Sequence, residues 1–207
     1  MRQVILENGL KYYEGQTKDH GEEHIREVMG NLNKLILMAE KDLGIRLNRE
    51  LMITAALYHD AGRSIDNEMH HIHSATIVRN EEYLKEIFDE YEIETIATMC
   101  AEHRSSNKKE CLDLMSALLN DADSMNTLEV IIERIYLYEN KLNKDRDEES
   151  TFEAVYKHLV DKYGKHGYQK FRTKYARELI DVEGMQKKIS MKGEIRKMYS
   201  TIVSNIK

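Results

Sequence analysis

Apolar residues recur every three or four positions along most of the chain, which is the spacing of an amphipathic helix. One such segment runs from Gly21 to about Leu43 and ends near Gly44, a residue type that often terminates helices. A second begins at Asn48, a candidate N-cap, and reaches the pair His59–Asp60 before stopping at Gly62. The apolar positions of the first segment are Val28, Leu32, Leu35 and Ala39, and His24 lies on the same stripe.

Further helical patterns cover the rest of the chain. We expect one or two helices over His70–Tyr91, a short helix over Ile93–His103, and a long helix from about Leu112 to Met125. From Ile131 to Lys207 we predict three more helical stretches, with breaks at the segments NKDRDEES and GKHG and at Glu183–Gly184. Because the sequence contains no proline, the pattern as a whole predicts an all-α protein.

Composition narrows the possible partners and surroundings. With 207 residues, of which 41% are hydrophobic, the chain can build the core of one domain. Its net charge of −6 and interspersed charges argue against a general nucleic-acid or membrane-surface binder. The sequence shows no signal-peptide pattern and no long apolar stretch, and Cys100 and Cys111 have no paired spacing. We therefore expect a cytoplasmic protein with reduced thiols, no membrane association and no stable nucleic-acid partner.

The strongest chemical signal is YHDAG at Tyr58–Gly62, where His and Asp are adjacent at a predicted helix end and can direct two ligand atoms at one ion. Such a pair alone also fits a core histidine beside an exposed carboxylate. Together with His24 and the segment Asn120–Asp123 on other helices, it gives inward polar groups that need a partner, because burying an unpaired ionisable group costs several kcal/mol. Nitrogen and oxygen ligands suit Mn, Fe, Co, Ni, Zn or Mg.

The order of motifs resembles the HD superfamily of metal-dependent phosphohydrolases between His20 and about Leu128. The resemblance implies an HD-domain helical bundle with additional C-terminal helices, organised as a single HD-type domain over residues 1–207. Residues 129–207 would complete the bundle. The same residues could also form part of the wall of the pocket. The motifs are HGEEHIREV (His20–Val28), AALYHDAGR (Ala55–Arg63), HHIHSA (His70–Ala75), AEH (Ala101–His103) and LNDAD (Leu119–Asp123).

By position, the resemblance implies His24, His59, Asp60 and Asp123 as ligands of a divalent metal ion. Asp123 is chosen over Asp121 because the family's last ligand follows an alanine, which leaves Asp121 as a supporting or capping group. In the same motif, His20 has two interpretations, a residue at the pocket edge or a capping or surface residue.

The resemblance also indicates that His70 and His103 line the active site. In dinuclear relatives these positions hold a second metal, and in mononuclear relatives they contact substrate phosphate, so one or two ions are expected. His71 and His73 should point to other faces, toward solvent. Arg63 is expected either to hold a phosphate oxygen or to be a surface cation, at a place where many relatives have lysine and others glutamate.

The implied function is hydrolysis of a phosphate ester or anhydride of a small molecule, with nucleotides as the favoured group, by attack of a metal-bound water. Asp60, Arg63, His70 and His103 are the expected catalytic residues, while the general acid has Asp66, Glu68 or a histidine as candidates. Two other functions stay open: a dinuclear iron oxygenase of the HD type and a non-catalytic nucleotide-binding module. The sequence predicts neither the substrate nor the oligomeric state.

Overall fold

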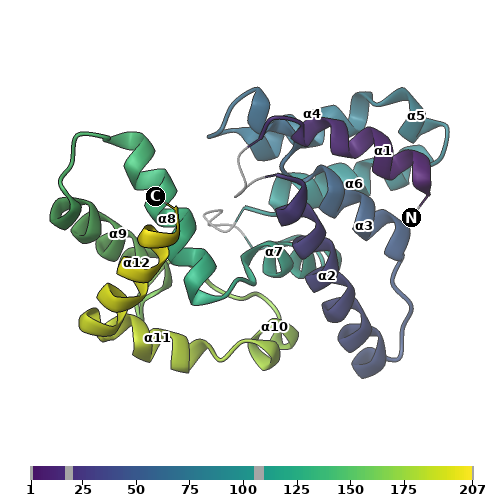
Figure 1. The fold of residues 1–207 in the computed structure, drawn as a ribbon. Coiled ribbons are helices and arrows are strands. Elements are labelled where there is room, and N and C mark those ends of the chain that lie inside the picture. Colours follow the sequence, from purple (N-terminus) through teal and green to yellow (C-terminus); the bar gives the residue numbers. More distant parts are fainter. Residues whose placement is uncertain (1, 17–20, 105–109, 207) are drawn as a thin grey trace. The chain divides into compact units, whose positions relative to one another are not determined.

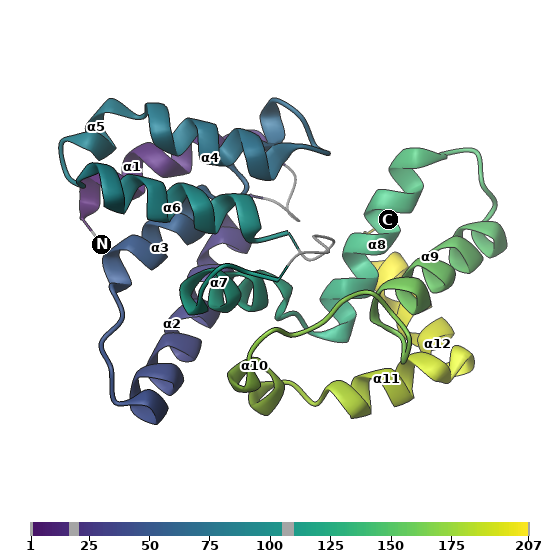
Figure 2. The same cartoon turned by 180° about the vertical axis from the view of Figure 1, so that it is seen from behind.

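The computed structural model describes residues 2–16, 21–104 and 110–206. Within these ranges all regular elements are helical and no strand is present, which confirms the predicted all-α fold (Figures 1 and 2). No helix among them has the length and hydrophobicity needed to cross a membrane. The chain divides into two compact units: one extends to Met125 and includes Phe171–Ala176, and the other comprises Asn126–Lys170 and Arg177–Lys207. The single domain over residues 1–207 stays a prediction, and each unit is described by itself.

The first unit is built around α3 (Arg49–Tyr58), whose residues from Leu51 to Tyr58 are all buried. A helix that is apolar on all sides belongs in the centre of a bundle, and α3 packs against both α2 and α6. α2 and α6 also pack against α7, and α4 lies against α6 and η3. The remaining elements of this unit are α1 (Gln3–Leu10), η1 (Lys11–Tyr13), α2 (Glu22–Leu43), η3 (Ala61–Ser64), α4 (His70–Asn80), α5 (Glu82–Lys85), α6 (Glu90–Glu102) and α7 (Leu114–Ser124).

The end of α2 and the start of α3 agree with the predicted signals, whereas α3 ends before the predicted pair His59–Asp60. The side chain of Asn48 accepts a hydrogen bond from the Leu51 N–H at 3.3 Å, which confirms the N-cap of α3. α2 ends at Gly44, whose φ of 65° is the left-handed conformation that terminates helices. α3 ends at Tyr58, so His59 and Asp60 lie in the turn that follows the central helix.

The second unit contains α8 (Leu128–Leu142), α9 (Glu148–Tyr163), α11 (Val182–Ser190) and α12 (Lys192–Ile206), which share one hydrophobic core. The short helix α10 (Lys174–Leu179) has residues in both units. The predicted helix break at Glu183–Gly184 is wrong, because both residues belong to the first turn of α11. The side chain of Asp181 accepts a hydrogen bond from the Gly184 N–H at 2.8 Å and so caps the helix just before this glycine.

Candidate metal centre

Four predicted ligands from separate helix ends lie together in the first unit. His24 belongs to the first turn of α2, His59 and Asp60 follow α3, and Asp123 is in the last turn of α7. Nε2 of His24 lies 3.2 Å from Asp123 Oδ1 and 3.9 Å from Asp60 Oδ2, and Nε2 of His59 lies 3.6 and 3.7 Å from the same two oxygens. Ligand atoms about 2.1 Å from one ion are roughly 3.0 to 3.4 Å from each other. The observed separations are within this range or slightly longer. A small inward movement of these side chains would therefore bring their ligand atoms to one cation.

A second pair of histidines faces the other oxygen of Asp60. Nε2 of His70, at the start of α4, lies 3.3 Å from Asp60 Oδ1, and Nε2 of His103, directly after α6, lies 3.5 Å from it. The two Nε2 atoms are 3.2 Å apart, and both side chains are buried. Asp60 thus has one oxygen directed at each histidine pair, which is the arrangement of a carboxylate that can bridge two ions.

Three of the histidine rings are held by the backbone of their own helix ends. In His59, His70 and His103, Nδ1 lies within hydrogen-bond distance of the carbonyl oxygen three residues earlier. Because a carbonyl only accepts, Nδ1 carries the proton, and Nε2 of the neutral ring has its lone pair for a metal. The acceptors are Ala56 O at 2.7 Å, Asn67 O at 2.8 Å and Cys100 O at 2.7 Å, respectively.

The donor set fits a divalent cation. Nε2 of His59 is buried, and its distance of 3.6 Å from Asp123 Oδ1 is too long for a good hydrogen bond. A buried nitrogen with no close hydrogen-bond partner in the described part of the chain is costly, and a cation coordinated by it would remove that cost. Imidazole nitrogens and carboxylate oxygens are ligands for Zn, Fe, Mn and related metals.

The charges within the site shift the pKa of several groups. Burial alone would favour neutral His59, but attraction to Asp60 and Asp123 outweighs it and raises the pKa of His59 to about 8. Burial lowers the pKa of His70 to about 3, and the neighbouring charges of Arg63 and His103 act in the same direction. His70 is therefore neutral at physiological pH and available as a ligand.

The two groups that meet at the α2 and α7 ends shift in the same sense. Burial lowers the pKa of His24, although Asp123 acts against this effect. Burial would raise the pKa of Asp123, but its interactions with the His24 and His59 rings keep that pKa well below the usual value. The Asp123 carboxylate is accordingly ionised, and with a side chain 24% exposed it is the ligand candidate nearest to solvent.

Arg63 lies against Asp60 with only 17% of its side chain exposed. Its Nε is 2.7 Å from Asp60 Oδ2, and its Nη1 donates a hydrogen bond to Asn67 Oδ1 at 2.6 Å. The guanidinium therefore orients the carboxylate that faces both histidine pairs, which the sequence did not predict. The alternative of a solvent-exposed surface cation does not describe this side chain.

Gly62 permits the close approach of η3 to α4. A Cβ atom at Gly62 would lie 2.4 Å from His70 O, 2.6 Å from His73 Cβ and 2.7 Å from Ser74 N, which real side chains do not tolerate. The Gly62 N–H also donates a hydrogen bond to Ser74 Oγ at 2.9 Å. These contacts fix the start of α4, and therefore His70, beside the turn that carries Asp60.

Two asparagines connect other helix ends of the site. Asn120, fully buried in α7, donates a hydrogen bond to His103 O at 2.8 Å and so joins α7 to the end of α6. Asn31 in α2 donates to Met125 O at 3.0 Å and joins α2 to the end of α7. Neither supporting role was predicted, since a donor to a backbone carbonyl has no characteristic sequence spacing.

Asp121, predicted as a supporting or capping group, hydrogen-bonds the segment before α10. Its Oδ1 accepts a hydrogen bond from Arg172 N at 2.6 Å, and its Oδ2 accepts from Thr173 N at 2.8 Å and Thr173 Oγ1 at 2.6 Å. The fully buried carboxylate thus fixes the segment before α10 to the first unit.

Other predicted residues are placed differently. His71 and His73 are half-buried, so the prediction that both are solvent-exposed is wrong; His73 lies against Gly62 of η3, and the His71 ring lies 5.7 Å from the His70 ring. His20 lies outside the described residues. Asp66 and Glu68 are exposed, and hydrogen bonds from the Met69 and Glu68 backbone lower the pKa of Asp66, which makes it a poor proton donor at neutral pH.

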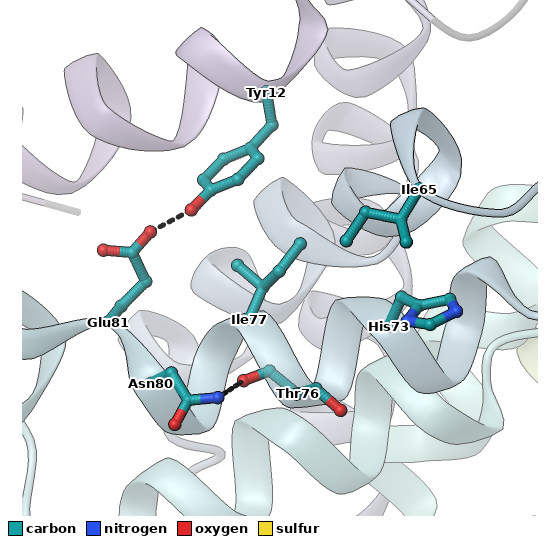
Figure 3. Close-up of a pocket in the computed structure, with 7 residues that line it drawn as sticks. All are labelled: Tyr12, Ile65, His73, Thr76, Ile77, Asn80 and Glu81. Atoms are coloured by element: carbon teal, nitrogen blue, oxygen red, sulfur yellow. Dashed lines mark hydrogen bonds between the residues drawn. The ribbon is translucent and has the colours of Figure 1, made fainter.

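A groove of about 300 Å³ runs along α4, but it contains none of the candidate ligands. Figure 3 shows Tyr12 over one end, where its hydroxyl donates a hydrogen bond to Glu81, while Ile65 and His73 border the other end. The groove is therefore distinct from the cluster of histidines and aspartates.

Comparison of the sequence with known proteins identifies one matching family. A family model described as HD domain matches residues 21–188, most of the chain. No curated protein and no solved structure matches the chain. The matched range contains all six side chains of the cluster, which are His24, His59, Asp60, His70, His103 and Asp123.

Proposed function

Because the chain belongs to the HD-domain family, we propose that it is a metal-dependent phosphohydrolase. In this proposal it cleaves a phosphate ester or anhydride of a small molecule, and nucleotides are the substrate class. His24, His59, Asp60 and Asp123 hold a divalent cation in this proposal. The observation that carries it is the position of Asp60, whose two oxygens face two different pairs of histidine nitrogens at 3.3 to 3.9 Å.

We further propose that His70, His103 and Asp60 Oδ1 hold a second ion. Because each ring donates an Nδ1 proton to a backbone carbonyl, the Nε2 atoms of the two rings face each other across a gap of 3.2 Å. Two lone pairs at that distance repel each other unless a proton or a cation lies close to both. A cation shared with Asp60 relieves this repulsion and gives the two-metal arrangement common in phosphoryl-transfer enzymes.

A bound divalent ion supplies an activated water and neutralises negative charge on phosphoryl oxygens. The protein supplies the geometry. Arg63 orients the Asp60 carboxylate, and its guanidinium has five N–H donors, more than its contacts to Asp60 and Asn67 require. We propose that Arg63 also binds a substrate phosphate oxygen, as charge-assisted hydrogen bonds favour.

The test is phosphate release from a panel of nucleotides and simple phosphate esters by metal-free protein supplied with Mn, Mg, Co, Ni or Fe. Asp60→Ala should abolish metal-dependent turnover, because both halves of the cluster lose their shared carboxylate. Asp145→Ala is the matched control, since Asp145 is exposed in the second unit and should leave turnover unchanged. Circular dichroism checks that both variants keep their helices, and unchanged turnover in Asp60→Ala would refute the proposal.

A dinuclear iron oxygenase is the second candidate, and the same observation favours it, because two histidine pairs sharing one carboxylate also suit two irons. The two activities give different results. Iron in the purified protein with a mixed-valence paramagnetic signal, together with no phosphate release from any substrate, would favour the oxygenase. A protein that binds nucleotides but turns over none of them would instead indicate a non-catalytic module.

A further inference from the structure

The end of α3 is capped by side chains rather than by backbone. The carbonyls in the last turn of a helix have no partner within the helix, and buried ones need a donor from elsewhere. In α3, three successive carbonyl oxygens each accept a hydrogen bond from a side chain. Cys100 Sγ donates to Ala55 O at 3.6 Å, His59 Nδ1 to Ala56 O at 2.7 Å, and Tyr13 Oη to Leu57 O at 2.7 Å.

Tyr13 is the one of these three donors that comes from the N-terminal segment, which precedes the family match at residues 21–188. Its side chain is only 5% exposed. Burial raises the pKa of the Tyr13 hydroxyl well above its usual value, and a hydrogen bond with the Asp60 backbone acts in the opposite direction. The hydroxyl donates its hydrogen bond to Leu57 O at 2.7 Å, two residues before His59.

The N-terminal segment is fixed on α3 by close packing. A Cβ atom at Gly9 would lie 2.4 Å from a methyl carbon of Leu57, so the backbone of α1 touches that side chain directly. Ile5, one helical turn earlier, is completely buried. This packing holds the Tyr13 hydroxyl at Leu57 O and leaves it little freedom to move away.

We propose that Tyr13 is a positioning residue of the metal centre, whose hydroxyl fixes the turn from Leu57 to Asp60 so that His59 and Asp60 point at the same ion. This inference rests on the proposed function, because it assumes that these two side chains bind metal. Tyr13 lies outside the matched family region, and the inference adds it to the residues that position the metal ligands.

The physical reason is the orientation of one peptide group. Without the hydroxyl, the buried Leu57 carbonyl loses its donor and has to rotate toward another one or remain unsatisfied. Rotation of that peptide is transmitted along the backbone to His59, two residues later, and then to Asp60. Changes in groups that orient metal ligands usually weaken metal binding about 10- to 100-fold.

The neighbouring tyrosine offers a matched control. Tyr12 is half-buried in the same 3-10 helix, but its hydroxyl donates to Glu81 in the groove along α4 (Figure 3). Tyr12→Phe and Tyr13→Phe remove the same atom from adjacent positions. They differ in whether the lost hydrogen bond belongs to the turn that carries the ligands.

The experiment is titration of metal-free full-length wild type, Tyr12→Phe and Tyr13→Phe with Mn²⁺, followed by the paramagnetic resonance of the free and bound ion. We expect Tyr13→Phe to bind Mn²⁺ about 10-fold or more weakly, with an altered bound-state spectrum, and Tyr12→Phe to match the wild type. Tyr13→Phe that loses thermal stability but keeps wild-type affinity and spectrum would overturn the inference. Wild type that binds neither Mn²⁺, Co²⁺ nor Zn²⁺ would overturn the proposed function itself.

A second pair of variants keeps the test decisive if Tyr13→Phe does not fold. Incorporation of 4-aminophenylalanine at position 13 keeps an N–H donor in place of the hydroxyl, and 4-fluorophenylalanine fills the same space without a donor. We expect the amino variant to retain Mn²⁺ affinity and the fluoro variant to lose it. Equal affinities of the two would overturn the inference.

Discussion

Replacement of Gly62 by alanine tests how the close contact between η3 and α4 supports the site. The new Cβ would lie 2.4 Å from His70 O and 2.7 Å from Ser74 N, both of which are backbone atoms of α4. Ordinary contact needs about 3.4 Å or more, so the helix has to retreat by roughly 1 Å. Overpacking of this kind costs about 1 to 3 kcal/mol, and weakening of the bond from Gly62 N–H to Ser74 Oγ adds about 1 kcal/mol.

Against this cost stands a gain of about 0.4 to 1 kcal/mol, because alanine restricts the unfolded chain. We therefore expect Gly62→Ala to lower the free energy of unfolding by about 1 to 3.5 kcal/mol. The same displacement moves His70 relative to Asp60, so metal-dependent turnover should fall as well. Urea unfolding of metal-free protein measures the first effect, and phosphate release with saturating metal measures the second.

Gly30→Ala is the control for this substitution. Gly30 lies within α2, and a Cβ there would meet nothing within 4 Å. Alanine in a helix interior should raise the free energy of unfolding by about 1 kcal/mol and leave turnover unchanged. If Gly62→Ala behaved like Gly30→Ala in both measurements, the argument that the glycine is required for close packing would be refuted.

Three further predictions concern charge and metal. Asp121→Asn should lower the free energy of unfolding in urea by about 3 kcal/mol, because an amide group cannot accept on both sides from Arg172 and Thr173; equal midpoints would contradict it. Below the His59 pKa of about 8, a metal ion has to displace a proton from the ring. Metal affinity should therefore rise about tenfold per pH unit up to that pH and then level off. Calorimetry in two buffers of different ionisation enthalpy detects the released proton. Removal of a metal present at 100 times its Kd should lower the melting temperature by about 5 to 10 °C in the wild type and not in Asp60→Ala.

The fold class could be predicted because it follows from residue type and spacing, and the ligand candidates because the order of motifs resembles the HD superfamily. Asn48 and Gly44 have side-chain and backbone properties that mark the start and the end of helices. His59 and Asp60 could be found because few residue types bind metals. The break at Glu183–Gly184 was wrong because a glycine in the first turn of a helix is tolerated when a cap such as Asp181 precedes it.

The supporting contacts could not be predicted, because their partners are backbone atoms. Asn31, Asn120 and Tyr13 each donate to a main-chain carbonyl, and any sequence supplies such an acceptor. The contact of Arg63 with Asp60 was missed for another reason: a cation three residues after a carboxylate can equally point to solvent, and only the turn after α3 decides between the two.

The distribution of these contacts explains why motifs reveal a ligand set better than they reveal its geometry. The rings of His59, His70 and His103 are each oriented by a carbonyl three residues earlier, so local sequence already determines which nitrogen faces the cluster. The distances between the rings depend instead on how separate helix ends meet, at Gly62 for α4, at Asn120 for α6 and at Tyr13 for α3. A variant at one of these junctions should therefore weaken metal binding while every candidate ligand is still present.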